Sequence, residues 1–179
     1  LLVNNAGFGT LGMYHETDYG RQEEMVRVHV LATMRLTRAA LKAMIARDRG
    51  AIINVSSVAG FARRGGNVSY CAAKGWMNDF TEGLSLELAA QRSRVQVQAL
   101  CPGFTYTEFH DVLGVDRGKI APSLWMKADF VVAESLRALD RGALFVIPGW
   151  RYRWFVALWT KLPVWLRMSL QLKSPHKRV

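Results

Sequence analysis

The sequence has few cysteines and no long apolar run. Its only cysteines are Cys71 and Cys101, and neither stands in a CxxC pair or in a close cluster with histidine. Two such cysteines cannot form a disulfide framework, and they indicate no metal site. No apolar stretch approaches the roughly 20 residues of a transmembrane helix, which excludes that kind of segment. Since no signal peptide is recognisable, the free thiols predict a reducing, cytoplasmic location.

What the sequence does have is enough apolar material for a core. Hydrophobic residues make up 50% of the 179 positions, which excludes intrinsic disorder and suits a single domain. The formal net charge is +10. The chain opens on Leu1–Asn4, a run typical of the end of a buried strand. We therefore expect a segment of unknown length to precede Leu1 in the parent protein, and a processed N-terminus is the alternative.

Strand-like apolar runs alternate with helix-length patterns, which predicts an α/β fold with a doubly wound parallel sheet. Four strands are fewer than the six of the common form, so we expect only the C-terminal part of such a sheet. Strands are predicted at residues 1–4, 51–56, 95–100 and 143–147. Helices are predicted from Thr17 or Asp18 to just before Gly50, at 69–91 and at 128–140. The first helix is expected to bury Met25, Val28, Leu31, Leu36, Leu41 and Ile45.

Three residues that can handle a proton are placed to converge. Tyr70 and Lys74 lie four positions apart on a predicted helix, so they share one of its faces. Ser57 lies 13 residues before Tyr70, where a predicted strand ends, and ligands of α/β sheets bind at such strand ends. A free phenol has a pKa near 10, too high for a base at neutral pH. An ammonium at ~4 Å would lower that pKa by about three units, so that Tyr70 could exchange a proton with a substrate oxygen held by Ser57.

Each of these signals has an ordinary structural explanation when it is taken alone. A tyrosine and a lysine at helical spacing are typical of a solvated helix face, and a serine at a strand end commonly caps a turn. Cys71 and Cys101 adjoin the same motifs, but neither has a neighbouring His or Asp that would make it a nucleophile. We expect both cysteines to be small buried packing residues.

The motifs carry more information as an ordered set. The chain resembles the classical short-chain dehydrogenases/reductases in the order and spacing of NNAG (Asn4–Gly7), NVSS (Asn54–Ser57), YCAAK (Tyr70–Lys74) and CPGFTYT (Cys101–Thr107). The resemblance implies a partial Rossmann-like NAD(P)-binding domain over residues 1–148, without its N-terminal glycine-rich unit, followed by a tail over 149–179. It also implies an oxidoreductase acting on CH–OH donors with NAD(P)(H), among which NADP(H) is slightly favoured.

The same resemblance implies roles for individual residues. Tyr70 would be the catalytic acid/base, Lys74 would lower its pKa and hold the nicotinamide ribose, and Ser57 would orient the substrate oxygen. Tyr70 and Lys74 thereby count as cofactor-binding residues as well. The other implied cofactor-binding residues are Asn4, Ala6 and Gly7 on the adenosine side and Pro102, Gly103, Thr105 and Thr107 around the nicotinamide, with Thr107 near its carboxamide.

One position departs from the family pattern. The helix before the Ser57 strand usually carries an asparagine, and here the sequence VHVLA places His29 there, 28 residues before Ser57. In the family this residue kinks the helix and holds a water in a relay that reaches the lysine. A histidine can also bind a water, so we count His29 among the catalytic residues. The alternative is an ordinary buried histidine between helices.

A glycine pattern at residues 7–12, GFGTLG, matches the dinucleotide fingerprint G-x-G-x-x-G. It lacks the context of that fingerprint, because no apolar helix opens after Gly12 and no acidic residue ends a strand about 20 residues later. We therefore interpret it as a loop beside the cofactor. The family's own glycine-rich turn, with the residues that distinguish NAD from NADP, lies upstream of NNAG.

Residues 141–179 contain eight basic residues, no acidic residue and four of the six tryptophans. These residues are Arg141, Arg151, Arg153, Lys161, Arg167, Lys173, Lys177 and Arg178, with Trp150, Trp154, Trp159 and Trp165. Such a mixture is typical of interfacial helices, here a pair broken at Pro163, and favours an anionic membrane surface as a partner. A lid over the substrate pocket or a subunit contact is the first alternative. Nucleic acid bound by charge alone is the second, but no motif supports it.

Two classes of function remain. In the first, the protein is an enzyme whose substrate is a small carbonyl compound or secondary alcohol. The irregular segment 104–127 lies where the family places its substrate loop, and its apolar residues favour a hydrophobic substrate: Phe109, Val112, Leu113, Leu124 and Trp125. In the second, the protein is a catalytically inactive binding protein or membrane-surface scaffold of the same fold, which the His29 departure indicates. The family commonly forms homo-oligomers through its two long helices.

Overall fold

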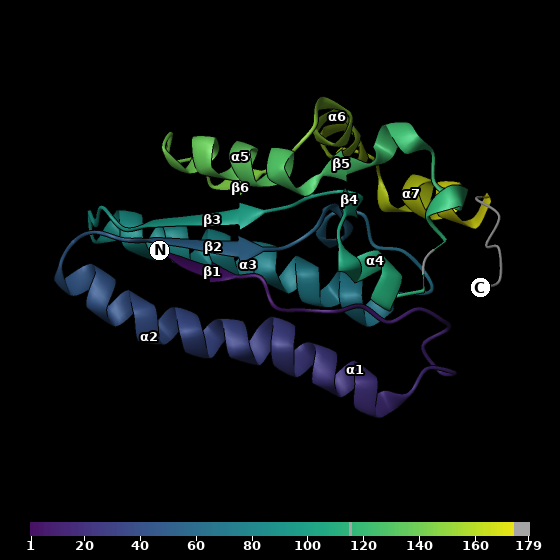
Figure 1. The fold of residues 1–179 in the computed structure, drawn as a ribbon, viewed down its shortest axis with the longest axis horizontal. Helices are drawn as coiled ribbons and strands as arrows, with labels where there is room; N and C mark the ends of the chain where they lie inside the picture. The colour runs from purple at the N-terminus through teal and green to yellow at the C-terminus, as the bar shows by residue number, and fades with distance from the viewer. Residues whose placement is uncertain (115, 174–179) are drawn as a thin grey trace.

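The computed structural model describes residues 1–114 and 116–173 and contains a four-stranded parallel sheet. In spatial order, its strands are β1 (Leu2–Asn4), β2 (Ala51–Val55), β3 (Gln96–Leu100) and β6 (Phe145–Val146). Neighbouring strands are parallel throughout, so their carboxyl ends all meet at one edge of the sheet. This arrangement confirms the predicted α/β fold (Figure 1).

Helices cover both faces of the sheet, as parallel strands require. One face carries a long helical rod and α3 (Val68–Ala90). The rod consists of α1 (Tyr19–Val26), a π-helical segment (Arg27–Ala32) and α2 (Thr33–Ala46). The other face carries α5 (Ala128–Leu139), which Figure 1 shows on the opposite side of the strands. Helices on both faces make the sheet doubly wound.

The alternation of side chains along β2 divides the core into two clusters. Ile52 packs with Met44 of α2 and Leu88 of α3 on one face. Its neighbour Ile53 points to the other face and packs with Val131 of α5. Full burial of such a side chain stabilises the fold by roughly 1.5–3 kcal/mol. Strand β2 is therefore held from both sides.

The first long helix buries a different face from the predicted one. Leu31, Leu36 and Ile45 are exposed, so the prediction is wrong for these three. The buried stripe is largely polar and consists of Gln22, Met25, His29, Thr33, Thr37 and Met44. Apolar spacing misses this face because polar side chains can be buried when they find hydrogen-bond partners.

A chain of buried polar side chains links β1, β2 and α3. The Asn4 amide donates to Asn54 Oδ1 at 2.7 Å and to Thr37 Oγ1 at 3.1 Å. The Asn54 amide donates to Thr81 Oγ1 at 2.9 Å, and that hydroxyl donates to the Met77 carbonyl at 2.6 Å. Each bond made here compensates for the desolvation of a buried group. The network fixes the ends of β1 and β2 relative to the helix that carries Tyr70.

The segment without clear periodicity forms several short elements. In chain order they are β4 (Thr105–Tyr106), α4 (Glu108–Val112), 3₁₀ turns at Arg117–Lys119 and Pro122–Leu124, and β5 (Met126–Lys127). Strands β4 and β5 pair with each other in a separate two-stranded sheet. These pieces lie beyond the carboxyl edge of the main sheet, next to the ends of β2 and β3 (Figure 1).

The tail forms two helices, α6 (Trp150–Trp159) and α7 (Val164–Lys173), with Pro163 directly before α7. The predicted break at Pro163 is therefore confirmed. Tyr152 and Val156 form the buried side of α6. Lys177 and Arg178 of the predicted basic set lie outside the described residues. Within the described part of the chain, no helix has both the length and the apolar character needed to cross a bilayer.

We predict that Asn54→Ala lowers the free energy of unfolding by about 3 kcal/mol, because two buried hydrogen bonds are lost and their partners remain buried. Urea unfolding measures the change. Gln91→Ala, a truncated amide on an exposed position at the end of α3, should cost less than about 0.5 kcal/mol. Equal losses in the two variants would contradict the role of the network.

Candidate active site

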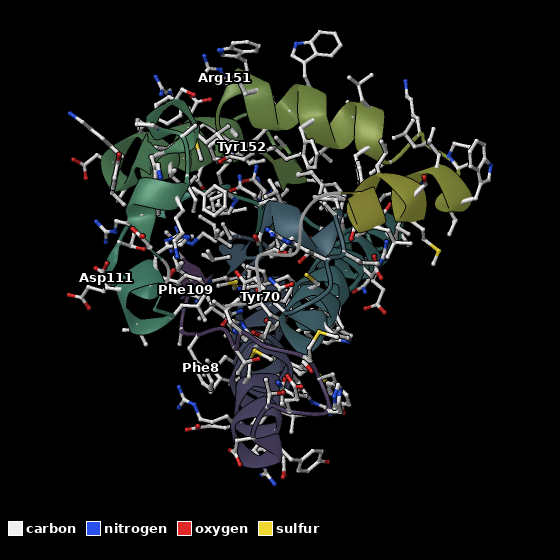
Figure 2. All side chains as sticks on the ribbon, turned by 90° about the vertical axis from the view of Figure 1, so that its right-hand side faces the viewer. Phe8, Tyr70, Phe109, Asp111, Arg151 and Tyr152 are labelled. Atoms are coloured by element: carbon white, nitrogen blue, oxygen red, sulfur yellow. The ribbon has the colours of Figure 1, made fainter. Side chains whose placement is uncertain are left out.

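The catalytic candidates come together at the carboxyl end of β2. Ser57 begins the 3₁₀ turn Val58–Gly60 that follows this strand, and Tyr70 and Lys74 lie in the first two turns of α3. His29 approaches from the π-helical segment of the first helix, with its ring centre 5.9 Å from that of Tyr70. Figure 2 shows Tyr70 with Phe8 and Phe109 on the side of the molecule where the strands end.

Ser57 is fixed by the turn in which it lies. Its hydroxyl accepts a hydrogen bond from the Ala59 amide at 3.1 Å and is 3.4 Å from the Pro102 carbonyl, to which it can donate. The same hydroxyl is close enough to that of Tyr70 to lower the pKa of the phenol. Ser57 therefore lies between the phenol and the loop after β3, where it can orient an oxygen shared with Tyr70.

Tyr70 does not have the acidic phenol that the sequence predicts. Burial raises its pKa to about 12, because water no longer stabilises the phenolate, and the polar influence of the Ser57 hydroxyl opposes this only in part. The Nζ of Lys74 lies 5.7 Å from the centre of the Tyr70 ring. The prediction of a lowered Tyr70 pKa is wrong for this structure, and at neutral pH the phenol keeps its proton.

Lys74 is buried and directs its amine at the backbone. Its Nζ donates to the Val55 carbonyl at 2.6 Å and lies 3.6 Å from the sulfur of Met77. Burial lowers the pKa of Lys74 to about 7, since the ammonium loses its hydration. The amine is therefore only partly charged at neutral pH, which further weakens its effect on Tyr70.

The buried ring of His29 is held in one tautomer. Its Nε2 lies 2.8 Å from the Phe8 carbonyl, which can only accept, so this nitrogen carries the proton. Nδ1 is then an acceptor, and it has no hydrogen-bond partner among the described residues. Burial and the nearby Lys74 lower the pKa of His29 to about 4. Gly7 lies directly against the ring, since a Cβ at this position would come within 2.1 Å of His29 Cε1.

The candidate cofactor-binding residues at the end of β1 and directly after it differ in whether a ligand can reach them. The Asn4 side chain is buried in the polar network described above, so its amide protons are already used. Ala6 and Gly7 are exposed at the strand end. A ligand can therefore reach the backbone of Ala6 and Gly7, whereas Asn4 acts by positioning the strand end.

The loop after β3 borders the other side of Ser57. Pro102 accepts from the Val58 amide at 3.1 Å through its carbonyl, which ties this loop to the turn after β2. Thr105 is buried, and its hydroxyl donates to the Gly103 carbonyl at 3.0 Å. Thr107 is exposed and precedes α4. The structure thus places Pro102, Gly103 and Thr105 in the loop that borders Ser57. Thr107 lies farther along the same segment, at an exposed position.

Tyr152 of α6 is a site-supporting residue that the sequence analysis missed. Its ring lies on Gly103, where a Cβ would come within 2.1 Å of Cζ. Its hydroxyl accepts from the Phe104 amide at 3.1 Å and donates to the Leu124 carbonyl at 2.7 Å. The tail therefore packs on the loop after β3. No local pattern marks Tyr152, because it lies among many aromatic residues.

Aromatic side chains from the irregular segment close over the site. Phe109 of α4 lies with its ring centre 5.7 Å from that of Tyr70. Phe109 and Leu113 also pack against Gly9, at 3.3 Å and 3.2 Å from the position of a Cβ there. Figure 2 shows Phe109 next to Tyr70. An apolar wall therefore lies beside the phenol.

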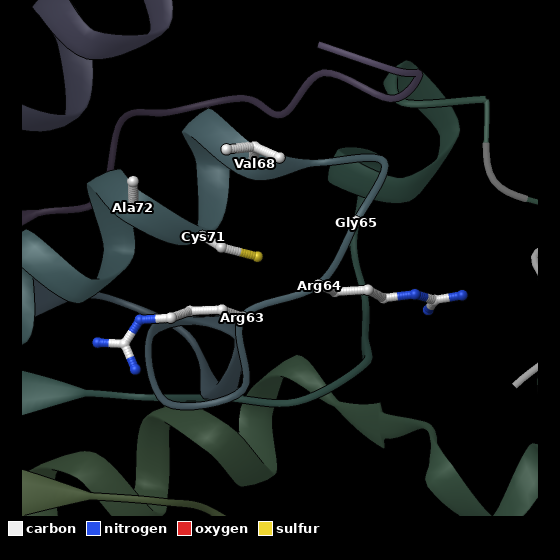
Figure 3. Close-up of a pocket in the computed structure, with 6 residues that line it drawn as sticks. All are labelled: Arg63, Arg64, Gly65, Val68, Cys71 and Ala72. Atoms are coloured by element: carbon white, nitrogen blue, oxygen red, sulfur yellow. The ribbon is translucent and has the colours of Figure 1, made fainter. Parts of the chain in front are cut away.

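A pocket lies next to the first turns of α3, lined by Arg63, Arg64, Gly65, Val68, Cys71 and Ala72 (Figure 3). Cys71 points toward it, with its Sγ 3.2 Å from Asn67 Oδ1, and burial raises the pKa of this thiol. Cys71 and Cys101 are both free and buried, which confirms their predicted packing role. A thiol with a raised pKa is a poor nucleophile.

The exposed backbone of Ala6 and Gly7 fits the adenosine side of a dinucleotide, and the donors of Ser57, Tyr70 and Lys74 fit its nicotinamide end. Gly7–Gly12 does not fit a pyrophosphate turn. Gly9 packs against α4, the Gly12 amide donates to the Gly66 carbonyl at 2.9 Å, and α1 begins only at Tyr19. The fingerprint needs a helix that opens at the glycines, so its sequence match is coincidental here.

Comparison with known proteins identifies relatives of this chain. The family model described as short chain dehydrogenase matches residues 1–117. A 3-oxoacyl-(acyl-carrier-protein) reductase of Aquifex aeolicus is 36% identical over 113 residues, which are 63% of this chain and 45% of the reductase. An inactive 2-(S)-hydroxypropyl-CoM dehydrogenase of Xanthobacter autotrophicus is 40% identical over 102 residues, which are 57% of this chain and 44% of that protein. The chain thus spans less than half the length of these relatives.

A solved structure extends the likeness to the tail. The short-chain dehydrogenase from Sphingobium yanoikuyae, in complex with NADPH, matches with a TM-score of 0.76 and 29% identity. The match covers 99% of this chain and 66% of that one. Both α6 and α7 therefore fall within the matched region.

We predict that His29 makes the fold sensitive to acid. Its pKa is about 4 in the folded chain, whereas a solvated histidine in the unfolded chain has a pKa of 6.5, so the unfolded chain binds more protons between these limits. The free energy of unfolding should fall by about 3 kcal/mol as pH drops from 6.5 to 4. Urea unfolding at several pH values measures this loss.

His29→Asn should remove most of that pH dependence, whatever its effect on stability at pH 7. His15→Asn, at an exposed histidine, should leave the dependence as in the wild type. An unchanged slope in His29→Asn would contradict the buried, neutral state of this ring.

Proposed function

Because the chain belongs to the short-chain dehydrogenase family, we propose that it contributes the catalytic residues of an oxidoreductase that transfers a hydride between NAD(P)(H) and a carbonyl or secondary alcohol. The observation that carries this proposal is the convergence of Ser57, Tyr70 and Lys74 at the carboxyl end of β2. Hydroxyl, phenol and amine are the donors that proton transfer at a substrate oxygen requires.

In the reducing direction, the Tyr70 hydroxyl would donate its proton to the substrate oxygen as that oxygen gains negative charge. A pKa of about 12 keeps the phenol protonated, which is the form that a proton donor needs. Ser57 would hold the same oxygen by a hydrogen bond and stabilise the phenolate left on Tyr70. The bound nicotinamide would supply the hydride.

Lys74 would act through a change in the protonation of its amine. With a pKa of about 7, its amine gains a proton when a negative charge forms nearby, and the phenolate of Tyr70 is such a charge. Its Nζ would also hold the nicotinamide ribose. The unpaired Nδ1 of His29 supports a place for this ring in the relay toward Lys74, where it would accept a hydrogen bond from a water.

The cofactor would lie across the ends of β1, β2 and β3. Ala6 and Gly7 would contact its adenosine side through their backbone, and Asn4 would hold that strand end in place. Pro102, Gly103, Thr105 and Thr107 would border the nicotinamide. We place NADP(H) before NAD(H), since the Sphingobium relative is in complex with NADPH.

The proposed substrate is hydrophobic. Phe109 lies beside Tyr70, and behind it Phe104, His110 and Trp125 form an aromatic cluster with ring centres 4.8–5.6 Å apart. Such a wall favours apolar groups next to the carbonyl carbon and offers few hydrogen bonds to a polar one.

We predict that Tyr70→Phe lowers kcat by about a thousandfold, because the proton donor is lost while the ring and its packing remain. The assay follows nicotinamide absorbance with a panel of ketones and uses the whole protein that contains this chain. Tyr106→Phe, at an exposed tyrosine nearby, should retain wild-type activity. Near-wild-type turnover in Tyr70→Phe would exclude Tyr70 from the mechanism, and no turnover in the wild type on any substrate would favour the inactive binding protein.

Ketones of increasing chain length provide a separate test of the substrate class. We expect kcat/KM to rise roughly threefold to fourfold for each added methylene that is buried, since each contributes about 0.8 kcal/mol. Phe109→Ser should reduce this dependence on chain length. Preferential turnover of short, polar carbonyls would overturn the proposed substrate class without affecting the role of Tyr70.

A further inference from the structure

The two tail helices turn their most apolar side chains outward. We call this surface the outer face; it consists of Trp150, Trp154, Phe155, Leu158, Val164, Trp165, Met168 and Leu172. Trp154 is 64% exposed and Trp165 is 70% exposed. The spacing 150, 154, 158 on α6 and 165, 168, 172 on α7 places each set along one side of its helix. A folded chain seldom leaves so many large apolar groups in water, which makes this face a candidate docking surface.

The charged residues of the tail itself are all basic. No acidic residue occurs from Arg141 to the end of the sequence, and Arg151, Arg153 and Lys161 are exposed on α6 and after it. Arg151 donates to the Ser123 carbonyl at 2.6 Å, and Arg153 lies 3.7 Å from Glu134. Glu134 partly neutralises Arg153, whereas the Ser123 carbonyl leaves the charge of Arg151 in place. With Lys161 exposed as well, the helices present net positive charge. A partner that fits must be apolar and anionic at once.

The shape of the surface limits the kind of apolar partner. Each helix has ten residues, which at 1.5 Å per residue span about 15 Å, half the thickness of a bilayer core. Such helices cannot cross a membrane, but they can lie in its interface. Tryptophan prefers the headgroup level, and basic side chains there attract anionic lipid.

A second copy of this chain fits less well. A symmetric contact would place the outer face against itself, so that Arg151, Arg153 and Lys161 would face the same cations. Like charges brought together in this way oppose association. A nucleic acid would satisfy the charge but would leave most of Leu158, Met168 and Leu172 in water.

We propose that the outer face of α6 and α7 docks on the surface of an anionic lipid bilayer. The inner side of the same helices contacts both loops that border Tyr70. Tyr152 bonds with the loop after β3, and Gln171 of α7 donates to the Arg63 carbonyl in the loop before α3. Docking would therefore place the rim of the candidate active site beside the lipid surface. Lipid binding does not depend on the proposed chemistry, and the two can fail separately.

The test is co-sedimentation of the full chain with phosphatidylcholine vesicles, with and without phosphatidylglycerol. We expect binding only when the anionic lipid is present and expect it to weaken with added salt. Trp154→Ser combined with Trp165→Ser should weaken binding at least about tenfold. Tyr19→Ser combined with Leu86→Ser, which removes equally exposed apolar groups from α1 and α3, should leave it unchanged.

Charge reversal gives a second measurement. Lys161→Glu should weaken binding roughly 30-fold, because one attraction becomes a repulsion. Lys42→Glu makes the same change in net charge at an exposed position of α2 and should have little effect. Circular dichroism of each variant checks that the fold is retained.

Three results would overturn the proposal. One is equal vesicle binding by the tryptophan double variant and the wild type. Another is a wild type that binds no anionic vesicle but binds an oligonucleotide through this face. The third is a self-association that the double variant abolishes while vesicle binding stays the same.

Discussion

The burial of Lys74 between α3 and the end of β2 determines the electrostatics of the candidate site. Its amine bonds with the Val55 carbonyl, and removal from water brings its pKa to about 7. The same dry surroundings raise the pKa of Tyr70 and lower that of His29. At neutral pH the phenol and the imidazole are therefore uncharged, and the amine is charged only in part. A site of this kind responds strongly to any charge that forms within it, because little water is present to screen that charge.

Much of the fold could be predicted from the sequence, because its signals are local and repeated. Buried parallel strands are continuous apolar runs, and AIINV and the run ending at Leu100 need no tertiary information to be recognised. The convergence of Ser57 with Tyr70 also follows from local rules. A strand end and the first turn of the next helix meet at one edge whenever strands are parallel. The break at Pro163 has an equally local cause.

Other features depend on contacts between distant residues. The buried stripe of the first helix contains Thr37, whose hydroxyl accepts from Asn4, and no periodicity reveals such a bond. The lowered pKa predicted for Tyr70 requires an opposing charge at ~4 Å in a solvated site, whereas burial dominates in the folded chain. Residues 104–127 fold through pairings such as Thr105 with Met126, which spacing along the chain does not encode.

Tyr152 has a consequence beyond local stability. A single phenol connects α6 to the Phe104 amide and the Leu124 carbonyl, and its ring fills the space above Gly103. Helix α6 is thereby joined to the backbone that borders Ser57. A contact that restrains the outer side of this helix would therefore also restrain the loop after β3, because Tyr152 holds both.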